Sequence, residues 1–240
     1  MARLSFSAEW RTTLFVVVLV PVMAGLGFWQ LSRAADKEAI AGEFERKQAA
    51  APAALEELLG DDPAALAYRP VTLTGQFRQR QYFLQDNRTV QGRYGNEVIG
   101  VFEPVGTDRL VLVNRGWIEA DASRQSLPEA PPVPGQVTIN GQVYVAPGKP
   151  YLLADQPLET GWPKRVQAVQ PDLLARALEA AGGSSGELFP WSVRLDGGQA
   201  AALQVDWQVV NVSPAKHRGY AVQWFTMALA LVVIFILRSS

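Results

Sequence analysis

Two long uncharged stretches lie near the ends of the chain. Residues 12–31 and 220–237 contain no charged side chain, and both are rich in aliphatic and aromatic residues. An apolar helix of about 20 residues matches the hydrocarbon core of a bilayer, whereas buried helices of soluble proteins rarely extend so far without a polar face. The pattern predicts one transmembrane helix over each stretch, and it makes the lipid bilayer one of the partners.

The first stretch also has a second interpretation, a cleaved signal peptide. Ser32 and Ala34 offer a small-x-small pair after the apolar run. The run is longer than the apolar core of a signal peptide, which has about 7–15 residues. Moreover, Trp29 and Gln30 stand where small residues should begin. We therefore expect an uncleaved anchor.

Between the two stretches, the hydrophobic pattern changes to a period of two. Apolar residues alternate with Thr and Gln from Val71 to Phe77, which is typical of a half-buried strand. Residues 137–145 keep one parity through Asn140-Gly141, so we expect a straight strand with a bend there rather than a hairpin. Further strands are predicted at 81–84, 98–102, 110–118 and 203–209.

Helical composition continues outward from the first stretch. Residues 37–59 are rich in Ala, Glu and Leu, and Pro52 breaks them, so a helix is expected to end there and then to resume over 52–59. A separate helix is predicted from Pro171, with Gly182-Gly183 after its end.

Because strands outnumber helices and no βαβ alternation occurs, the sequence predicts a mainly β fold class. We expect an antiparallel barrel or sandwich with one added helix, anchored by two transmembrane α-helices. The predicted domains are a cytoplasmic N-terminus (1–11), a first span (12–31), an extracytoplasmic, mainly β domain (32–219), a second span (220–237) and a cytoplasmic C-terminus (238–240).

The short flanks of the two spans predict the orientation. Arg3 and Arg11 precede the first span against Glu9, and Arg238 follows the second. Positive residues in short flanks favour the cytoplasm, so both ends are expected there. No Arg-rich presequence precedes the first span, which favours a bacterial plasma membrane over an imported organelle protein. The net charge of −1 offers no basic surface for nucleic acid, and the absence of Cys excludes disulfides.

Signatures of catalysis are nearly absent. Residues 182–186 match the G-x-S-x-G pattern around Ser184, but they follow a predicted helix instead of a strand, so we interpret them as a loop. The single His and the lack of Cys leave too few ligands for a zinc site. We therefore do not expect an enzyme, and a periplasmic hydrolase is the weakest alternative.

The boundary before the second span carries a cluster of basic and aromatic residues. Lys216, Arg218 and Tyr220 are typical interfacial anchors. Gln223 is different, because a polar amide one turn into the bilayer requires a partner helix. His217 and Trp224 are seven residues apart and so share one helix face, about 10 Å apart along the axis.

Four sequence blocks, spread over nearly the whole chain, carry a family resemblance. They are 27–33 (GFWQLSR), 68–77 (YRPVTLTGQF), 111–118 (VLVNRGWI) and 217–225 (HRGYAVQWF). In this order they resemble the surfeit locus protein 1 family of membrane factors for cytochrome c oxidase assembly. The first block of the family usually continues to a Trp-Lys pair; here Ala35-Asp36-Lys37 lacks that Trp, so its role does not carry over.

The resemblance implies a non-enzymatic role with haem A as a transient cofactor. Its implied partners are the catalytic subunit of a haem-copper oxidase and haem A synthase. In some bacterial members of the family, the counterpart of His217 is implicated in binding haem A. An imidazole nitrogen is a common axial ligand of haem iron, and His217 is the only imidazole in this chain. The candidate cofactor-binding residues are therefore His217, as the ligand of haem iron, together with Lys216, Arg218, Gln223 and Trp224.

Several alternatives remain open at this level. The protein is either a haem A chaperone or a scaffold that holds the oxidase subunit without contacting haem. Trp117 in the third block either lies in the core or binds a partner. Trp29, Gln30 and Arg33 either face the second span near Gln223 or anchor the first span at the lipid interface.

Overall fold

The computed structural model describes residues 9–60, 62–146, 148, 152, 156–182, 186–207 and 212–239. The chain divides into two compact units. One is helical and is built from the two ends of the chain, Met1–Glu45 and Gln208–Ser240. The other, Arg46–Trp207, is rich in β-structure. Ser184 of the G-x-S-x-G pattern lies outside the described residues, as do Gly183 and Val209.

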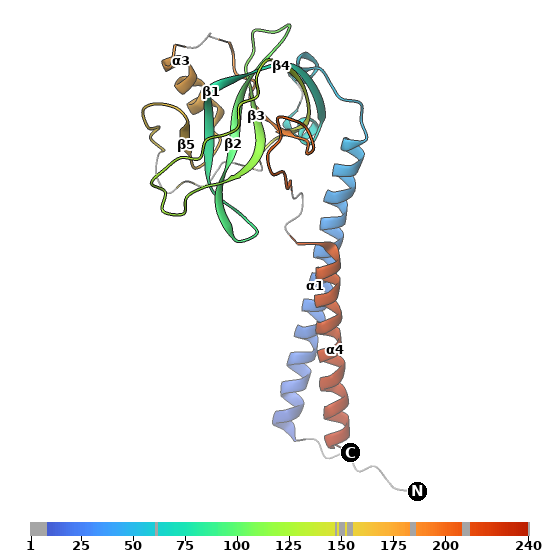
Figure 1. Ribbon diagram of the computed structural model, residues 1–240. Coiled ribbons are helices and arrows are strands. Elements are labelled where there is room, and N and C mark those ends of the chain that lie inside the picture. The colour runs from blue at the N-terminus through green and yellow to red at the C-terminus, as the bar shows by residue number, and fades with distance from the viewer. Residues whose placement is uncertain are drawn as a thin grey trace. The chain divides into compact units, whose positions relative to one another are not determined.

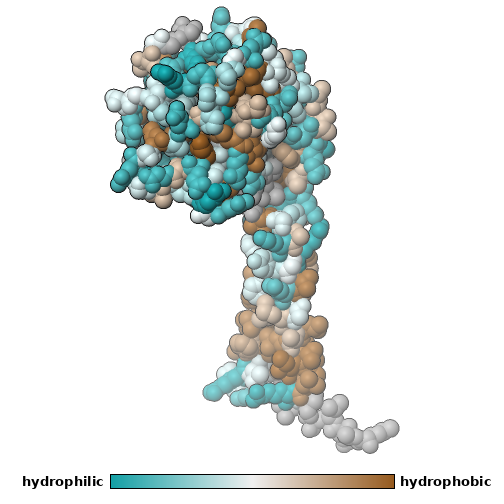
Figure 2. Space-filling view, in the orientation of Figure 1, coloured by the Kyte–Doolittle hydropathy of each residue, from teal (hydrophilic) through white to brown (hydrophobic). Residues whose placement is uncertain are grey.

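The helical unit consists of α1 (Trp10–Gln48) and α4 (Pro214–Ser239), which lie side by side in Figure 1. Each contains an 18-residue window with a mean hydropathy of 2.2, so both are long and apolar enough to cross a membrane. Figure 2 shows hydrophobic side chains gathered on the lower part of this helical pair. The two predicted apolar helices are therefore present. α1 continues helically well past Leu31 and ends before Pro52, as its composition predicts.

Small residues line the contact between α1 and α4. Gly27 and Ala34 are buried on α1, and Ala221 and Ala228 are buried on α4. Each pair is spaced seven residues apart, or about two turns, so each falls on one helix face. Small side chains allow two helix backbones to approach closely where lipid supplies no hydrophobic driving force.

The β-rich unit is a closed barrel. Its strands are β1 (Pro70–Val90), β2 (Arg93–Pro104), β3 (Val111–Glu119), β4 (Gln136–Tyr144), β5 (Lys164–Val166) and β6 (Ser192–Leu195). The sheet order is β2-β3-β6-β4-β1-β5, and β1 also pairs with β2, so five strands form a ring with β5 added beside β1. The mainly β barrel expected from the sequence is thus present.

The sheet is mixed rather than wholly antiparallel. β3 pairs with β6 and β1 pairs with β5 in parallel, while the remaining pairs are antiparallel. A parallel partner requires a long crossover connection, which the segments before β5 and β6 supply. The sequence pattern could not show this, because alternation reports which face is buried and not which strand is the neighbour.

β1 is longer than the two short strands predicted in its place. It pairs with β4 over Pro70–Gln76 and with β2 from Gly75 onward, with register shifts after Phe77 and Gln85. Such irregularities bend a strand, and here they carry β1 from one neighbour to the other. β4 runs straight through Asn140-Gly141 as expected; a Cβ at Gly141 would lie 2.4 Å from the carbonyl oxygen of Arg194, so only Gly fits.

Two apolar clusters lie on opposite faces of the barrel wall. The larger one fills the barrel and includes Phe77, Phe102, Val113 and Val193. The second includes Phe83, Ile99 and Leu112 and is covered by α3 (Pro171–Ala180), the separate helix that the sequence predicts. The remaining helical turns are a 3₁₀ helix (Leu55–Leu58), where helix was expected to resume, and α2 (Pro63–Leu66).

The strand predicted over 203–209 is wrong for its described residues. Residues 203–207 contain no strand, only an isolated bridge between Gln204 and Trp117. Alternation nevertheless occurs because Leu203 packs against an apolar cluster while Trp207 Nε1 donates to the carbonyl oxygen of Leu195. An irregular segment that lies along a barrel end can bury alternate residues without a continuous ladder.

Candidate functional site

His217 lies in the first turns of α4 and contacts α1. Its Nδ1 is 2.7 Å from Oε1 of Gln30, so Nδ1–H can donate to the amide oxygen. A neutral imidazole that donates from Nδ1 keeps a lone pair on Nε2. Hydrogen bonds of this kind orient an imidazole and fix its tautomer in metal sites. His217 is half-buried, and Gln30 holds its ring in place.

The two basic neighbours of His217 differ in their surroundings. Arg218 forms an ion pair with Glu38 of α1, whereas Lys216 is exposed and has no ion pair within the described parts of the chain. Lys216 is therefore available to an anionic ligand, while Arg218 already ties α4 to α1. Since the Arg218–Glu38 pair is exposed, it contributes little to stability on its own, about 0–1 kcal/mol.

Trp224 and Gln223 lie deeper along α4. Trp224 is half-buried, and Gln223 is exposed, with no hydrogen bond among the described residues. The adjacent Phe225 packs edge-on against Phe28, with ring centroids 5.2 Å apart. The ring of Phe225 also fills the space beside Gly27, where a Cβ would come within 2.5 Å of it. At this depth, α1 and α4 therefore meet through the aromatic ring of Phe225 and the small residue Gly27. Gln223 takes no part in this contact.

The residues at the end of the first span were expected either to face the second span or to anchor the first span at the lipid interface, and they differ in this respect. Gln30 faces α4, but its partner is His217 rather than Gln223. Trp29 is 49% exposed, and the guanidinium carbon of Arg33 lies 5.8 Å from the centre of its ring. Trp29 and Arg33 therefore fit an interfacial anchor, and Gln30 belongs to the candidate site.

The sequence did not indicate that Gln30 pairs with His217 or that Glu38 pairs with Arg218. The signal that was present is that Gln30 and His217 both stand at the same side of an uncharged stretch, one after the first and one before the second. If the two spans run antiparallel, these positions lie at the same depth. Glu38 follows Gln30 by eight residues, so it lies about two turns further along α1 and is rotated by about 80° around the helix axis.

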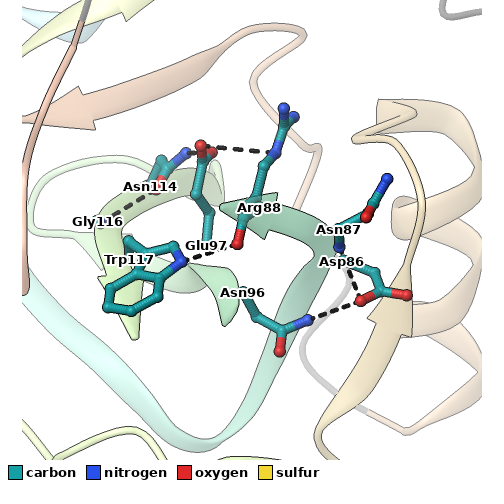
Figure 3. A network of polar contacts seen from close by, with 8 residues as sticks. All are labelled: Asp86, Asn87, Arg88, Asn96, Glu97, Asn114, Gly116 and Trp117. Carbon is teal, nitrogen blue, oxygen red and sulfur yellow. Dashed lines mark hydrogen bonds and ion pairs between the residues drawn. The ribbon is translucent and has the colours of Figure 1, made fainter. Parts of the chain in front are cut away.

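Asn114 to Trp117, the core of the third block, form buried polar contacts in β3, and Figure 3 shows those of Asn114, Gly116 and Trp117. Asn114 donates to Glu97 over 2.6 Å, and Trp117 Nε1 donates to the carbonyl oxygen of Arg88 over 2.9 Å. Arg115 donates to the carbonyl oxygens of Ala201 and Pro131, both over 2.9 Å.

This network favours the core interpretation of the third block. Trp117 is only 6% exposed, and the positive φ of Gly116 (110°) is a conformation that Gly adopts without strain. Arg115 and Trp117 donate to carbonyl oxygens of the barrel, and Asn114 donates to Glu97 in the barrel wall.

The arrangement around His217 suits ligand binding. Within the described residues, no group of three or more His, Asp or Glu side chains is placed to hold a bare metal ion. A single oriented imidazole can instead supply one axial ligand to an iron whose other ligands come from a porphyrin. This chemistry requires no general base and no activated nucleophile.

The chain is also similar to known proteins along most of its length. Residues 17–229 match the model of the SURF1 family. The chain is 24% identical over 237 residues to a SURF1-like protein of Rickettsia felis, which covers 95% of this chain and 96% of that protein. It is 27% identical over 235 residues to a SURF1-like protein of Drosophila melanogaster, covering 90% and 73%. A SURF1-like protein of Monosiga brevicollis is 33% identical over 143 residues.

Proposed function

Because the chain belongs to the SURF1 family, with residues 17–229 matching the family model, we propose that it is a membrane assembly factor for cytochrome c oxidase that binds haem A. It assists the insertion of haem A into the catalytic subunit, or stabilises it there. The observation that carries the proposal is the hydrogen bond between His217 and Gln30, which leaves Nε2 of the only imidazole free to bind iron.

The residues around His217 fit a haem group. Haem A supplies an iron with open axial positions, an apolar ring and tail, and two anionic propionates. His217 would hold the iron through Nε2, and the hydrogen bond to Gln30 would orient its ring. The exposed ammonium of Lys216 pairs with a propionate, while Arg218 serves the same purpose only if it exchanges Glu38 for the ligand.

Trp224 and Gln223 are placed to contact the same ligand. Trp224 lies seven residues after His217 on the same face of α4, and its indole offers apolar surface to the ring or the tail. Gln223 is exposed, with no hydrogen bond in the described structure, so its amide is free for the ligand or for the oxidase subunit. No residue in this set is assigned a catalytic role, and we propose that the protein is not an enzyme.

The setting of this activity is the plasma membrane of a bacterium. α1 and α4 are long and apolar enough to span it, with the β-rich unit extracytoplasmic and both ends of the chain in the cytoplasm. The proposed partners are the catalytic subunit, which receives haem A, and haem A synthase, which supplies it. The alternative is a scaffold that binds the catalytic subunit without contacting haem.

A complementation experiment separates these two functions. A strain that lacks this protein but makes haem A and the oxidase apoprotein is complemented with the wild type or with His217→Ala. The haem A content of the oxidase is measured in membranes, and the Soret band is measured on each purified protein. We expect His217→Ala to lose the Soret band and at least tenfold of its haem-to-protein ratio while it stays inserted and folded.

Trp224→Leu is the matched variant, because it keeps apolar bulk and leaves the proposed iron ligand intact. We expect it to reduce haem occupancy less than His217→Ala does. Full occupancy with an unshifted Soret band in His217→Ala would show that another group holds the iron, with Met23 and Met227 the next side chains to examine. An oxidase with normal haem A content in the deletion strain would rule out the assembly role.

A further inference from the structure

A polar pocket lies on the outer face of the barrel, in the β-rich unit and outside the haem site. It has a volume of about 550 Å³. Arg194 and Ser192 alternate along β6 with Val193 and Leu195, which face the core of the barrel, so the first two point to the opposite face. Asn114 of β3, the neighbour of Arg194 in the sheet, continues this polar surface.

The pocket is built from buried polar side chains. Gln85, Asp86, Asn114 and Ser192 line it, and each is at most 8% exposed. Strands β1, β3 and β6 all contribute to this set, so it is fixed by the sheet rather than by one loop. Buried polar groups of this kind are costly unless they have partners. A pocket lined by several buried polar groups is typical of a ligand site.

The charged groups in the wall do not balance. Three arginines, Arg88, Arg124 and Arg194, line the pocket together with two carboxylates, Asp86 and Glu97. Arg124 lies 3.5 Å from Asp86, and Arg88 lies 3.5 Å from Glu97. Arg194, by contrast, forms no ion pair within the described parts of the chain. Among the described residues that line the pocket, arginines outnumber carboxylates by one.

The guanidinium of Arg194 is held in place without an anionic partner. Its carbon lies 3.5 Å from the ring centre of Tyr144 and 4.8 Å from that of Trp207. Its Nε is buried and has no hydrogen-bond acceptor among the described residues. Burial lowers the pKa of Arg194 below the usual value for Arg, while Tyr144 and the carboxylate of Glu97, which is not within ion-pair distance, act in the opposite direction.

Arg194 is half-buried, and a partly desolvated guanidinium without a contacting anion is less favourable than one with an anion beside it. Stacking on two aromatic rings fixes the plane of the fork and leaves its N–H groups to a ligand. The excess of one charge matches a monoanion. The side chains of Tyr144, Ala168 and Val169 add apolar surface to the same wall.

We propose that this pocket binds a small organic acid, whose single carboxylate pairs with the guanidinium of Arg194 and whose apolar body lies against Tyr144 and Val169. The planar guanidinium and the carboxylate form two parallel hydrogen bonds. Ser192 and Asn114 are further hydrogen-bonding groups within the same wall. This site is independent of the haem proposal, because none of its residues belongs to the helical unit.

The test uses the full chain in an uncharged detergent. Benzoate and benzamide have the same shape but differ by one negative charge, so they are titrated separately at constant ionic strength by calorimetry. We expect saturable binding of benzoate and at least tenfold weaker binding of benzamide. Arg194→Gln should reduce benzoate affinity at least tenfold, whereas Arg194→Lys should keep part of it.

Arg93→Gln is the control for loss of a positive charge. Arg93 lies over the ring of Trp117 and pairs with Glu119, and it does not line the pocket. We expect its benzoate affinity to equal that of the wild type. Equal binding of benzoate and benzamide by the wild type would overturn the proposal without any variant. Tighter binding of inorganic phosphate than of benzoate would also overturn it, because a dianion exceeds the single unpaired charge.

Discussion

At the scale of single residues, two side-chain pairs join α4 to α1. Gln30 pairs with His217, and Glu38 pairs with Arg218. The two pairs have different consequences, because Gln30 acts on the proposed ligand itself while Glu38 engages its neighbour. When Nδ1–H donates to the amide oxygen of Gln30, the lone pair that remains for iron is on Nε2.

The first prediction at this scale concerns Gln30 as a positioning residue. Gln30→Leu removes the acceptor of Nδ1–H, so the ring of His217 loses its fixed orientation. Loss of such a partner costs a metal site about 10–100-fold in affinity, and we expect a fall in haem occupancy of that size. Haem-to-protein ratio and Soret position are measured together, because a ring that turns also shifts the spectrum.

Gln30→Glu supplies the rescue control, since a carboxylate still accepts the hydrogen bond. We expect it to restore the Soret position of the wild type. If Gln30→Leu keeps both the occupancy and the spectrum of the wild type, Gln30 does not position His217.

At the scale of elements, the contact of α1 with α4 depends on small residues against one large ring. Gly27 leaves room for Phe225, while Ala34, Ala221 and Ala228 keep the backbones close. The contact places His217 opposite Gln30, so its geometry supports the proposed site.

The prediction at this scale is that Gly27→Ile displaces α4. A Cβ at residue 27 would lie 2.5 Å from the Phe225 ring, so a larger side chain forces the helices apart. Overpacking of this kind costs about 1–3 kcal/mol. We expect a lower melting temperature and reduced haem occupancy, and the double variant Gly27→Ile with Phe225→Ala should recover both.

Gly25 is the matched position on the same helix. No atom lies within 4 Å of a Cβ placed there, so Gly25→Ile should leave both quantities close to those of the wild type. Equal effects at residues 25 and 27 would mean that the variants act through helix propensity or insertion and not through packing.

Several elements could be predicted from the sequence because their signals are local. The uncharged stretches, the alternation of Val71–Phe77 and the helix after Pro171 each depend on residues close together in the chain. β6 and β5 could not be found in this way, since they have only four and three residues and pair across long connections. The closure of the barrel by β1 depends on register shifts that no local pattern reveals.

The residues of the candidate site, too, could be predicted only where their signal is local in the sequence. His217 could be singled out because it is the only His and stands at a span boundary. Its partner could not, since Gln30 and His217 are 187 residues apart and only helix packing brings them together. The unpaired Arg194 could not be predicted either, because no strand is expected over residues 192–195 and no local pattern shows that Asp86 and Glu97 pair with other arginines.

At the scale of the whole molecule, the β-rich unit is one continuous segment, Arg46–Trp207, whereas the helical unit is assembled from both ends of the chain. The topology prediction belongs here. The chain has no native Cys, so single cysteines can be labelled without background.

We expect Ser126→Cys, on an exposed loop of the β-rich unit, to react with an impermeant maleimide on intact cells without an outer-membrane barrier. Ser7→Cys, in the N-terminal flank, should react only after the cells are opened. Labelling of Ser7→Cys together with protection of Ser126→Cys would reverse the proposed orientation.

The wide separation of Gln30 and His217 has a consequence for biosynthesis. At about 5–20 residues per second, the ribosome needs roughly 10–40 s after Gln30 before His217 is made. During this interval α1 stands alone in the bilayer, and the amide of Gln30 has no helix partner to satisfy it. If the β-rich unit is exported as proposed, the pair that completes the proposed haem site forms only after that export, and an immature chain would lack the site.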